Sequence, residues 1–392
     1  MINRKLGLYI HIPFCIKKCS YCDFLSFAAT PQVREQYVNQ LTKELEVRSA
    51  SFRNFSVDTV FLGGGTPSVL EERQIAQIME ALQTNFSIEK EAEITMEMNP
   101  GTVDSNKLSV YRNVGINRVS FGVQSLQEKE LQLLGRIHTV QQFYENYDAA
   151  RKTGFENINI DLMSALPNQT LEDVRKNIEA AVKLAPEHIS CYGLIIEEGT
   201  LFYQMYEEQE KRRQAGEERL SDTLPTEELE REMYQWISEF LEKHGYVHYE
   251  ISNYAKPGRE CKHNLKYWER KEYLGVGMGA ASFVGETRFS NIKNMETYLK
   301  ANITEDIQML QSEKEKIQQT EAMEEFMFLG LRKMQGISKR EFYENFGKEY
   351  MQVYGKVHEK LVRQGLLENA GDRVHLSKQG IDVSNYVMGE FF

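Results

Sequence analysis

The first two hundred residues alternate between short apolar runs and longer polar stretches with helical spacing. The apolar runs predict strands over residues 6–13, 59–62, 93–98, 118–122, 157–161 and 188–194. The amphipathic stretches predict helices over residues 33–49, 71–85, 104–114, 140–153 and 171–184. Because repeated strand–helix units form a parallel sheet covered by helices, the pattern predicts an α/β fold with an open, partial (β/α)6 barrel. Ligands of such a fold bind at the carboxyl ends of the strands.

The pattern becomes less regular after residue 200. A charged run over residues 207–232 predicts a solvated helix or a mobile loop, and residues 236–244 resume a helix. Residues 246–254 and 288–291 predict further strands.

From about residue 320 the chain predicts short helices followed by a small hairpin over residues 365–368 and 373–377. This order is similar to that of a winged-helix module, for which the acidic balance of the chain favours a lid or docking role over DNA binding. The chain therefore divides into a barrel, a post-barrel α/β extension and a C-terminal module, which cover residues 1–200, 201–310 and 311–392.

Composition argues against two broad classes of function. The chain has 47 Lys and Arg against 58 Asp and Glu, and this net charge of −11 argues against unspecific binding to nucleic acid. No uninterrupted apolar stretch approaches the roughly 20 residues that span a membrane. Residues 6–12 superficially mimic a short signal peptide, but they lead straight into a cysteine loop and predict the first strand instead. We therefore expect a cytoplasmic protein with no nucleic acid partner and no membrane span.

Three cysteines stand close together after the first predicted strand. Cys15, Cys19 and Cys22 have the spacing C-x-x-x-C-x-x-C. A [4Fe–4S] cluster normally takes four cysteines, so three within eight residues would leave one iron open. A zinc site usually has two cysteine pairs or nearby histidines, whereas Cys191 and Cys261 are isolated. Five cysteines in 392 residues do not make a disulfide scaffold.

Glycine and polar residues follow several of the predicted strands. The segment Gly-Gly-Gly-Thr-Pro at residues 63–67 either lets the backbone approach a ligand closely or makes a tight turn. Glu97, Gln124, Arg136 and Asp161 stand at or after the ends of successive strands. A carboxylate suits ribose hydroxyls, and an arginine suits a ligand carboxylate. Each could instead cap the sheet, but the order of the set on consecutive units favours a binding site.

These segments resemble the HemN-like subfamily of radical-SAM proteins. Tyr-Ile-His-Ile-Pro-Phe-Cys, Gly-Gly-Gly-Thr-Pro, Gly-Val-Gln-Ser and Gly-Arg-Ile-His, which begin at residues 9, 63, 122 and 135, all recur in that subfamily. The resemblance implies that the three cysteines hold a [4Fe–4S] cluster whose open iron chelates S-adenosylmethionine (SAM). It implies that SAM is contacted by Tyr9, Tyr21, Gly64, Gly65, Thr66, Glu97, Gln124, Arg136 and Asp161, and by backbone atoms of Gly193 and Ala281. It also implies a HemN-type C-terminal domain.

Two departures separate this chain from oxygen-independent coproporphyrinogen III oxidase, the best-known enzyme of the subfamily. The cysteine motif of that enzyme continues C-x-x-C-x-C, but here the position two after Cys22 is Phe24. The enzyme also carries an N-terminal extension ahead of its cysteine loop, whereas fourteen residues precede Cys15. Both departures argue against porphyrinogen decarboxylation.

A second motif points to heme. Residues 263–268 read His-Asn-Leu-Lys-Tyr-Trp, and together with Phe24 this motif resembles the heme chaperones of the same subfamily. The resemblance runs from about Leu6 to Tyr386 and implies that the chain binds heme for delivery to client hemoproteins.

The residue types in this motif suit heme chemistry, but they also suit a protein core. His263 could offer a neutral imidazole to heme iron, and Asn264 could orient that imidazole. Tyr267 and Trp268 could stack on the macrocycle. Alternatively, His263 and Trp268 fix this segment to the barrel. Cys261 is a competing heme ligand or attachment site, although a lone intracellular cysteine is more often a packed thiol.

The sequence therefore predicts a heme chaperone that binds a [4Fe–4S] cluster, SAM and heme and lacks coproporphyrinogen oxidase activity. The alternative is an anaerobic radical-SAM enzyme, such as oxygen-independent coproporphyrinogen III oxidase or a radical methyltransferase. A chaperone would bind heme without forming a porphyrin product, whereas an enzyme would consume SAM in proportion to its substrate. An electron donor and a cluster-dependent homodimer are further hypotheses.

Overall fold

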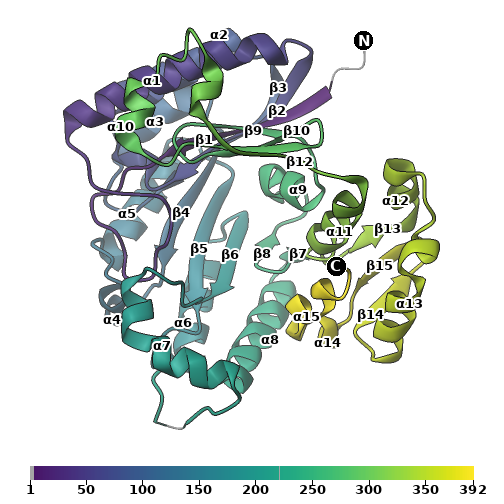
Figure 1. Cartoon of the computed structure of the whole chain (residues 1–392). Coiled ribbons are helices and arrows are strands. Elements are labelled where there is room, and N and C mark those ends of the chain that lie inside the picture. Colours follow the sequence, from purple (N-terminus) through teal and green to yellow (C-terminus); the bar gives the residue numbers. More distant parts are fainter. Residues whose placement is uncertain (1–3, 220) are drawn as a thin grey trace.

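The computed structural model describes residues 4–219 and 221–392 (Figure 1). A twelve-stranded mixed sheet with helices packed against it makes up the larger part of these residues, and a small C-terminal module lies beside it. The order of the strands in the large sheet is β12-β11-β10-β9-β1-β2-β3-β4-β5-β6-β8-β7.

Six strands in the middle of this sheet run parallel and follow one another in chain order. They are β1 (Arg4–Ile12), β2 (Phe55–Gly64), β3 (Ile88–Met98), β4 (Arg118–Gln124), β5 (Ile158–Ser164) and β6 (His188–Gly193). The helices between them are α1 (Pro31–Ser49), α2 (Glu72–Asn85), α3 (Ser105–Asn113), α4 (Glu128–Leu133), α5 (Val140–Lys152) and α6 (Leu171–Lys183), with 3₁₀ turns η1 (Ala50–Phe52) and η2 (Pro67–Val69). The predicted partial (β/α)6 barrel is confirmed, while the short helix α4 has no counterpart in the prediction.

The parallel strands are nearly continuous apolar runs in the sequence because both faces of this part of the sheet are buried. In β4, the consecutive residues Val119, Ser120 and Phe121, which point to alternate faces of the sheet, are all buried. Several helices are preceded by a residue whose side chain accepts a hydrogen bond from a backbone N–H of the first turn. These N-cap residues are Thr30, Asp104, Thr139 and Thr170. Such caps fix where each helix starts, and for α1, α3 and α6 they thereby set the length of the loop at the carboxyl end of the preceding strand.

The segment after β6 extends both edges of the same sheet. On one edge, β7 (Val247–Glu250) and β8 (Asn253–Ala255) form a hairpin that pairs with β6. On the other edge, β9 (Tyr273–Val276) pairs with β1 and is followed by β10 (Ala281–Val284), β11 (Thr287–Asn291) and β12 (Gln311–Lys316). The helices of this segment are α7 (Leu201–Gln214), α8 (Glu227–Lys243), α9 (Lys262–Trp268), α10 (Met295–Lys300) and the 3₁₀ turn η3 (Ile307–Leu310).

The structure corrects one prediction for this segment and refines another. The single strand predicted over residues 246–254 is wrong, because the chain reverses at Ile251 and Ser252 to form the β7–β8 hairpin. The charged run over residues 207–232 is helical at both ends, in α7 and α8, and its residue 220 lies outside the described residues.

A buried charged network joins α1 to this extension. Arg48 and Glu44, whose side chains are 4% and 0% exposed, form an ion pair of 2.7 Å. The Glu44 carboxylate also accepts hydrogen bonds from Asn291 Nδ2, the Gly277 N–H and the Tyr298 hydroxyl. A buried ion pair stabilises a fold only when further hydrogen bonds satisfy both charges, as they do here. The network therefore fixes α1 against the strands that extend the sheet beyond β1.

The C-terminal module has a small sheet and a hydrophobic core of its own. Its antiparallel strands stand in the order β13 (Ile337–Ser338), β15 (Arg373–Leu376) and β14 (Leu367–Ala370). Its helices are α11 (Gln319–Gly330), α12 (Lys339–Phe346), α13 (Tyr350–Arg363), α14 (Lys378–Asp382) and α15 (Ser384–Gly389). The predicted helices followed by a hairpin are confirmed. Across residues 4–219 and 221–392, no helix is both long enough and apolar enough to cross a membrane.

Candidate functional site

The loop between β1 and α1 carries the three clustered cysteines and is held by backbone hydrogen bonds. The Cys15 N–H donates to the Phe27 carbonyl at 3.1 Å, and the Phe27 N–H donates to the Pro13 carbonyl at 3.0 Å. Farther along, the Ser20 N–H donates to the Leu134 carbonyl at 3.0 Å. These bonds keep the loop at the carboxyl ends of the parallel strands, where ligands of such barrels bind.

The three thiols line one cavity, which we call the cysteine cavity. None of them is in a disulfide. Cys15 Sγ lies 3.4 Å from the Thr66 hydroxyl, and Arg136 Nη1 donates to Cys19 Sγ at 3.4 Å. Burial raises the pKa of the Cys22 thiol to about 11. Metal binding at this thiol would therefore release a proton, because the thiolate is the ligand.

This donor set fits an iron–sulfur cluster better than a single metal ion. Within the described residues, no three His, Cys, Asp or Glu side chains converge on a point that could hold one ion. The thiolate ligands of a [4Fe–4S] cluster bind different irons, so they need only surround a common space, as these cysteines do. The Arg136 guanidinium beside Cys19 would also offset negative charge on the thiolates.

The glycine turn after β2 packs closely against the cysteine loop. The Gly65 N–H donates to the Ile12 carbonyl at 2.8 Å, and a Cβ atom on Gly65 would lie 2.7 Å from the Phe14 carbonyl oxygen. Gly64 has a φ of +112°, and a Cβ atom there would lie 2.5 Å from the His11 ring. Only glycine fits either position without a shift of the neighbouring segment. The turn thus brings the end of β2 onto the wall of the cysteine cavity.

The predicted polar residues line the same cavity: Glu97 and Gln124 from the ends of β3 and β4, Asp161 from within β5, and Arg136 from the loop after α4. Asn99 links two parts of the wall, because its Oδ1 accepts from Arg136 Nη2 at 2.8 Å and its Nδ2 donates to Thr66 Oγ1 at 2.7 Å. Gln124 has a φ of 72°, and its Oε1 accepts from the Tyr192 hydroxyl at 2.9 Å. Residues that are far apart in the sequence therefore form one polar surface facing the cysteines.

The other expected SAM contacts lie at different places. Tyr21, Gly64, Gly65 and Thr66 line the cysteine cavity. Tyr9 does not line the cysteine cavity. Its hydroxyl lies 3.0 Å from His11 Nδ1, and its ring stacks on Phe61. Gly193 lines an adjoining cavity, and Ala281 is exposed at the start of β10.

Sequence reasoning missed several residues of the cavity wall: Ser26, Met98, Asn99, Gly122 and Tyr192. The positions of two of them in the sequence could have indicated that they line the cavity. Asn99 follows Glu97 by two residues at the same strand end, and Tyr192 is the residue before the last of β6. Ser26 had no signal, because it reaches the cavity only through the fold of the cysteine loop.

Two carboxyl groups lie together in the cavity wall. Glu97 Oε2 accepts from the Gly64 N–H at 3.1 Å, and Asp161 accepts from Ser120 Oγ at 3.0 Å and Asn159 Nδ2 at 2.7 Å. Burial, helped by the charge of Asp161, raises the pKa of Glu97 to about 8. Burial also raises the pKa of Asp161, against the effect of its hydrogen bonds. At neutral pH the ligand-free protein therefore holds a proton on Glu97.

The raised pKa of Glu97 predicts a pH dependence of the stability of the ligand-free protein. Below about pH 4.5 the carboxyl is protonated in both the folded and the unfolded state, and above about pH 8 it is ionised in both. Between these values only the folded state holds the proton, so the free energy of unfolding falls as the pH rises. We expect the free energy of unfolding of Glu97→Gln to depend less on pH between about pH 4.5 and pH 8 than that of the wild type. Urea denaturation at several pH values measures this difference.

Glu91→Gln is a matched control, because Glu91 is an exposed glutamate on the same strand. It should keep the pH dependence of the wild type. An identical pH dependence in the Glu97→Gln variant and the wild type would contradict the prediction.

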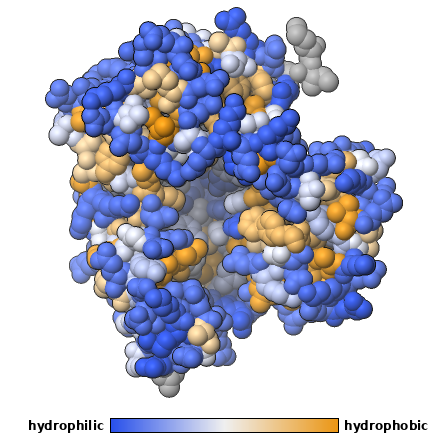
Figure 2. All heavy atoms as spheres, in the orientation of Figure 1, coloured by the Kyte–Doolittle hydropathy of each residue, from blue (hydrophilic) through white to orange (hydrophobic). Residues whose placement is uncertain are grey.

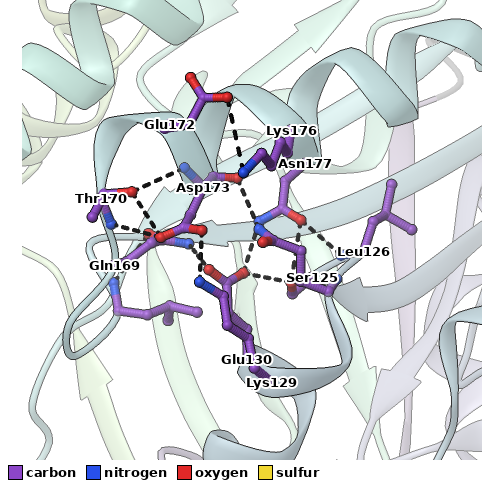
Figure 3. A network of polar contacts seen from close by, with 12 residues as sticks. Ser125, Leu126, Lys129, Glu130, Gln169, Thr170, Glu172, Asp173, Lys176 and Asn177 are labelled. Carbon is purple, nitrogen blue, oxygen red and sulfur yellow. Dashed lines mark hydrogen bonds and ion pairs between the residues drawn. The ribbon is translucent and has the colours of Figure 1, made fainter.

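A buried polar network anchors the loop after β4 (Figure 3). The carboxylate of Glu130 on α4 accepts hydrogen bonds from Ser125 Oγ, from Asn177 Nδ2 at 2.8 Å and from Gln169 Nε2 at 3.1 Å. Asn177 lies on α6, so the network ties α4 to α6. Since Ser125 follows Gln124 directly, this anchor also holds Gln124 in its left-handed backbone conformation on the cavity wall.

The imidazole of His263 lies in the protein interior, 1% exposed. Its Nδ1 is 2.9 Å from Thr59 Oγ1, its Nε2 is 2.9 Å from the Tyr267 hydroxyl, and its ring stacks on Phe61. Burial lowers the pKa of His263 to about 3, so the ring is neutral. Both ring nitrogens have partners, and a heme iron could bind this imidazole only by displacing Thr59 or Tyr267.

The rest of the motif has the contacts of core and interface residues. The guanidinium carbon of Arg332 lies 4.4 Å from the ring centre of Trp268. Asn264 is partly buried. Cys261 is 1% exposed, and its Sγ lies 3.6 Å from Glu93 Oε1. Burial raises the pKa of the Cys261 thiol to about 12, which opposes formation of the thiolate that heme iron would bind.

Known proteins resemble this chain in sequence and in fold. The family model of the Radical SAM superfamily matches residues 9–181, and that of the HemN C-terminal domain matches residues 317–383. The heme chaperone HemW of Lactococcus lactis is 36% identical over 100% of this chain and 98% of its own length. The heme chaperone HemW of Bacillus subtilis is 37% identical over 98% of each chain.

Among solved structures, coproporphyrinogen III oxidase (HemN) from Escherichia coli, described as a radical SAM enzyme, has a TM-score of 0.83 with 23% identity. The alignment covers 99% of this chain and 90% of that one. At this identity the likeness shows a shared fold.

Proposed function

The chain belongs to the heme chaperone HemW family of radical SAM proteins, and we propose that it binds a [4Fe–4S] cluster, SAM and heme and delivers the heme to client hemoproteins. Similarity to HemW proteins over the full length carries this proposal. The cavity at the strand ends, where three free thiols face polar residues from several barrel strands, supports it.

In this proposal Cys15, Cys19 and Cys22 hold the cluster and leave one iron for SAM. The bound cluster and SAM supply one-electron chemistry at the sulfonium. The Arg136 guanidinium, which already donates to Cys19 Sγ, is placed to pair with the SAM carboxylate as well. Glu97 and Asp161 offer carboxyl oxygens to the ribose hydroxyls.

Partners other than heme stay predictions. Lys17 and Lys18 are exposed between Cys15 and Cys19, so an acidic electron donor would meet complementary charge beside the cluster. A cluster-dependent homodimer and a cytoplasmic location also stay predictions.

The second candidate function is a radical-SAM enzyme that turns over a porphyrinogen. The shared fold with coproporphyrinogen III oxidase over 99% of the chain favours it. An anaerobic titration of heme into cluster-reconstituted protein separates the two functions. The same protein is then incubated with SAM, dithionite and coproporphyrinogen III, and the porphyrins are analysed.

Saturable one-to-one binding of heme without protoporphyrinogen formation is the result expected of a chaperone. Formation of product with absent or nonspecific heme binding would reject the chaperone proposal and assign the chain to the enzymes.

A further inference from the structure

A second cavity lies between the barrel, α8 and the C-terminal module and has a volume of about 670 Å³. Its size lies within the roughly 300–1,000 Å³ of small-molecule sites. Tyr192 lines both this cavity and the cysteine cavity, so the two are neighbours. Figure 2 shows the molecule hollowed between the barrel and the C-terminal module, with hydrophobic residues on both sides of the hollow. We call the second cavity the interdomain cavity.

Exposed apolar side chains from the barrel and from the C-terminal module line the interdomain cavity. Ile195 after β6 is 68% exposed, and Tyr386 of α15 is 48% exposed. Gly193 adds open space, because a Cβ atom there would meet no atom of the described residues within 4 Å. A flat apolar ligand in this cavity would cover hydrophobic surface that otherwise faces water.

Three arginines and three carboxylates line the interdomain cavity, so a ligand carboxylate could be held only by an arginine that is not already paired with one of them. Arg213 pairs with Glu230, and Arg231 lies 3.7 Å from Asp382, so two of the lining arginines have acidic partners. Arg332 also lines the cavity, and its Nε is buried with no hydrogen-bond partner among the described residues. A guanidinium with unused donors suits a ligand carboxylate, which it can bind through two parallel hydrogen bonds.

Trp268 and the backbone hold Arg332 in place. The Arg332 carbonyl accepts from the Ile251 N–H at 3.1 Å, which joins the chain after α11 to the β7–β8 hairpin. The guanidinium carbon lies 4.4 Å from the ring centre of Trp268, a cation–π distance. The carboxyl of Glu250 is close enough for this cation to lower its pKa; its Oε1 accepts from the Ser252 N–H and from Asn253, whereas its Oε2 has no hydrogen-bond partner among the described residues. The last residue of the His-Asn-x-x-Tyr-Trp motif thus supports a cation that faces the cavity.

We infer that heme binds in the interdomain cavity, with a propionate carboxylate on Arg332 and with Trp268 positioning that arginine. This inference rests on the proposed heme chaperone function. The apolar walls contact the macrocycle, and the guanidinium neutralises a propionate in a partly water-excluded place. Trp268 acts on heme through Arg332, and His263 stays in the core. Because Tyr192 borders both cavities, the heme lies next to the cysteine cavity.

A pair of probes tests the role of Arg332. Heme and heme dimethyl ester, whose carboxylates are blocked, are titrated separately into cluster-reconstituted wild type, Arg332→Ala, Arg332→Lys, Trp268→Ala and Trp268→Phe. We expect Arg332→Ala to weaken heme binding by about tenfold or more and to leave the affinity for the ester unchanged. Arg332→Lys should lose less affinity than Arg332→Ala, and Trp268→Phe should lose less than Trp268→Ala.

The matched control is a double variant, Lys262→Ala with Lys271→Ala. These exposed lysines line a different cavity, of about 770 Å³, whose wall also includes Thr59. The double variant should bind heme like the wild type. Iron and sulfide content is measured for every variant, so that loss of the cluster is not mistaken for loss of heme binding.

Three outcomes would overturn the inference. Wild-type heme affinity in Arg332→Ala would remove the arginine from the site. An equal loss for heme and for the ester would show a general effect on the fold. Weakened binding in the lysine double variant alone would place heme in the other cavity. A wild type that binds no heme would instead reject the proposed function, on which this inference depends.

Discussion

Replacing Cys19 with alanine is expected to abolish assembly of the [4Fe–4S] cluster. Cys19 is one of three thiols on the wall of the cysteine cavity, and its Sγ accepts a hydrogen bond from Arg136 Nη1. Its loss leaves two thiolates for a cluster that normally has four ligands, too few to hold it. The remaining cysteines cannot substitute, because Cys191 and Cys261 are buried in other parts of the fold. Iron and sulfide per chain after anaerobic reconstitution measure the effect.

Cys191→Ala serves as the matched control for this experiment. Cys191 is a buried thiol in β6, and it does not line the cysteine cavity. Its variant should contain iron and sulfide at the level of the wild type. Full iron and sulfide in Cys19→Ala would show that the assignment of the cluster ligands is wrong.

Replacing Gly65 with alanine is expected to damage the cluster site without removing any ligand. The added Cβ would lie 2.7 Å from the Phe14 carbonyl oxygen and 2.9 Å from the Phe14 nitrogen, and both are backbone atoms that cannot rotate away. The cysteine loop must therefore shift at the residue before Cys15. Overpacking of this kind costs about 1–3 kcal/mol of stability. We expect a lower midpoint of urea denaturation and about tenfold or more weaker SAM binding, measured by equilibrium dialysis.

The control for this variant is Gly355→Ala. Gly355 lies within α13, and the nearest atom to a Cβ there would be Met351 Cε at 3.7 Å. Alanine in a helix interior is more favourable than glycine, so this variant should be at least as stable as the wild type. Wild-type stability and SAM affinity in Gly65→Ala would mean that the cysteine loop tolerates a shift, against the packing described above.

The barrel could be predicted because its signals are local. Strands buried on both faces read as apolar runs, and helices capped by residues such as Thr139 and Thr170 start where the sequence indicates. The carboxyl ends of parallel strands meet at one edge, so Glu97, Gln124 and Asp161 could be grouped before their contacts were known. The cluster prediction was also local, because it rested on the resemblance of the segment around Cys15, Cys19 and Cys22 to radical-SAM proteins more than on their spacing alone.

Other features could not be predicted, because they depend on contacts between distant segments. The helix α4 is short, and the buried carboxylate of Glu130 holds it through Asn177 and Gln169, which are 47 and 39 residues away in sequence. The strand predicted over residues 246–254 became a hairpin that completes one edge of the sheet. No periodicity within either segment reports such contacts.

The His-Asn-x-x-Tyr-Trp motif separates what the sequence by itself determined from what only the tertiary structure decided. The sequence determined that an imidazole and an indole lie five residues apart, which suited either a heme ligand or a core. The tertiary structure alone decided that His263 is enclosed by Thr59, Phe61 and Tyr267 and that Trp268 lies under Arg332. The physical reason is that residue type sets what a side chain can bind, whereas burial and the neighbours brought by other segments set which of its atoms remain free to bind.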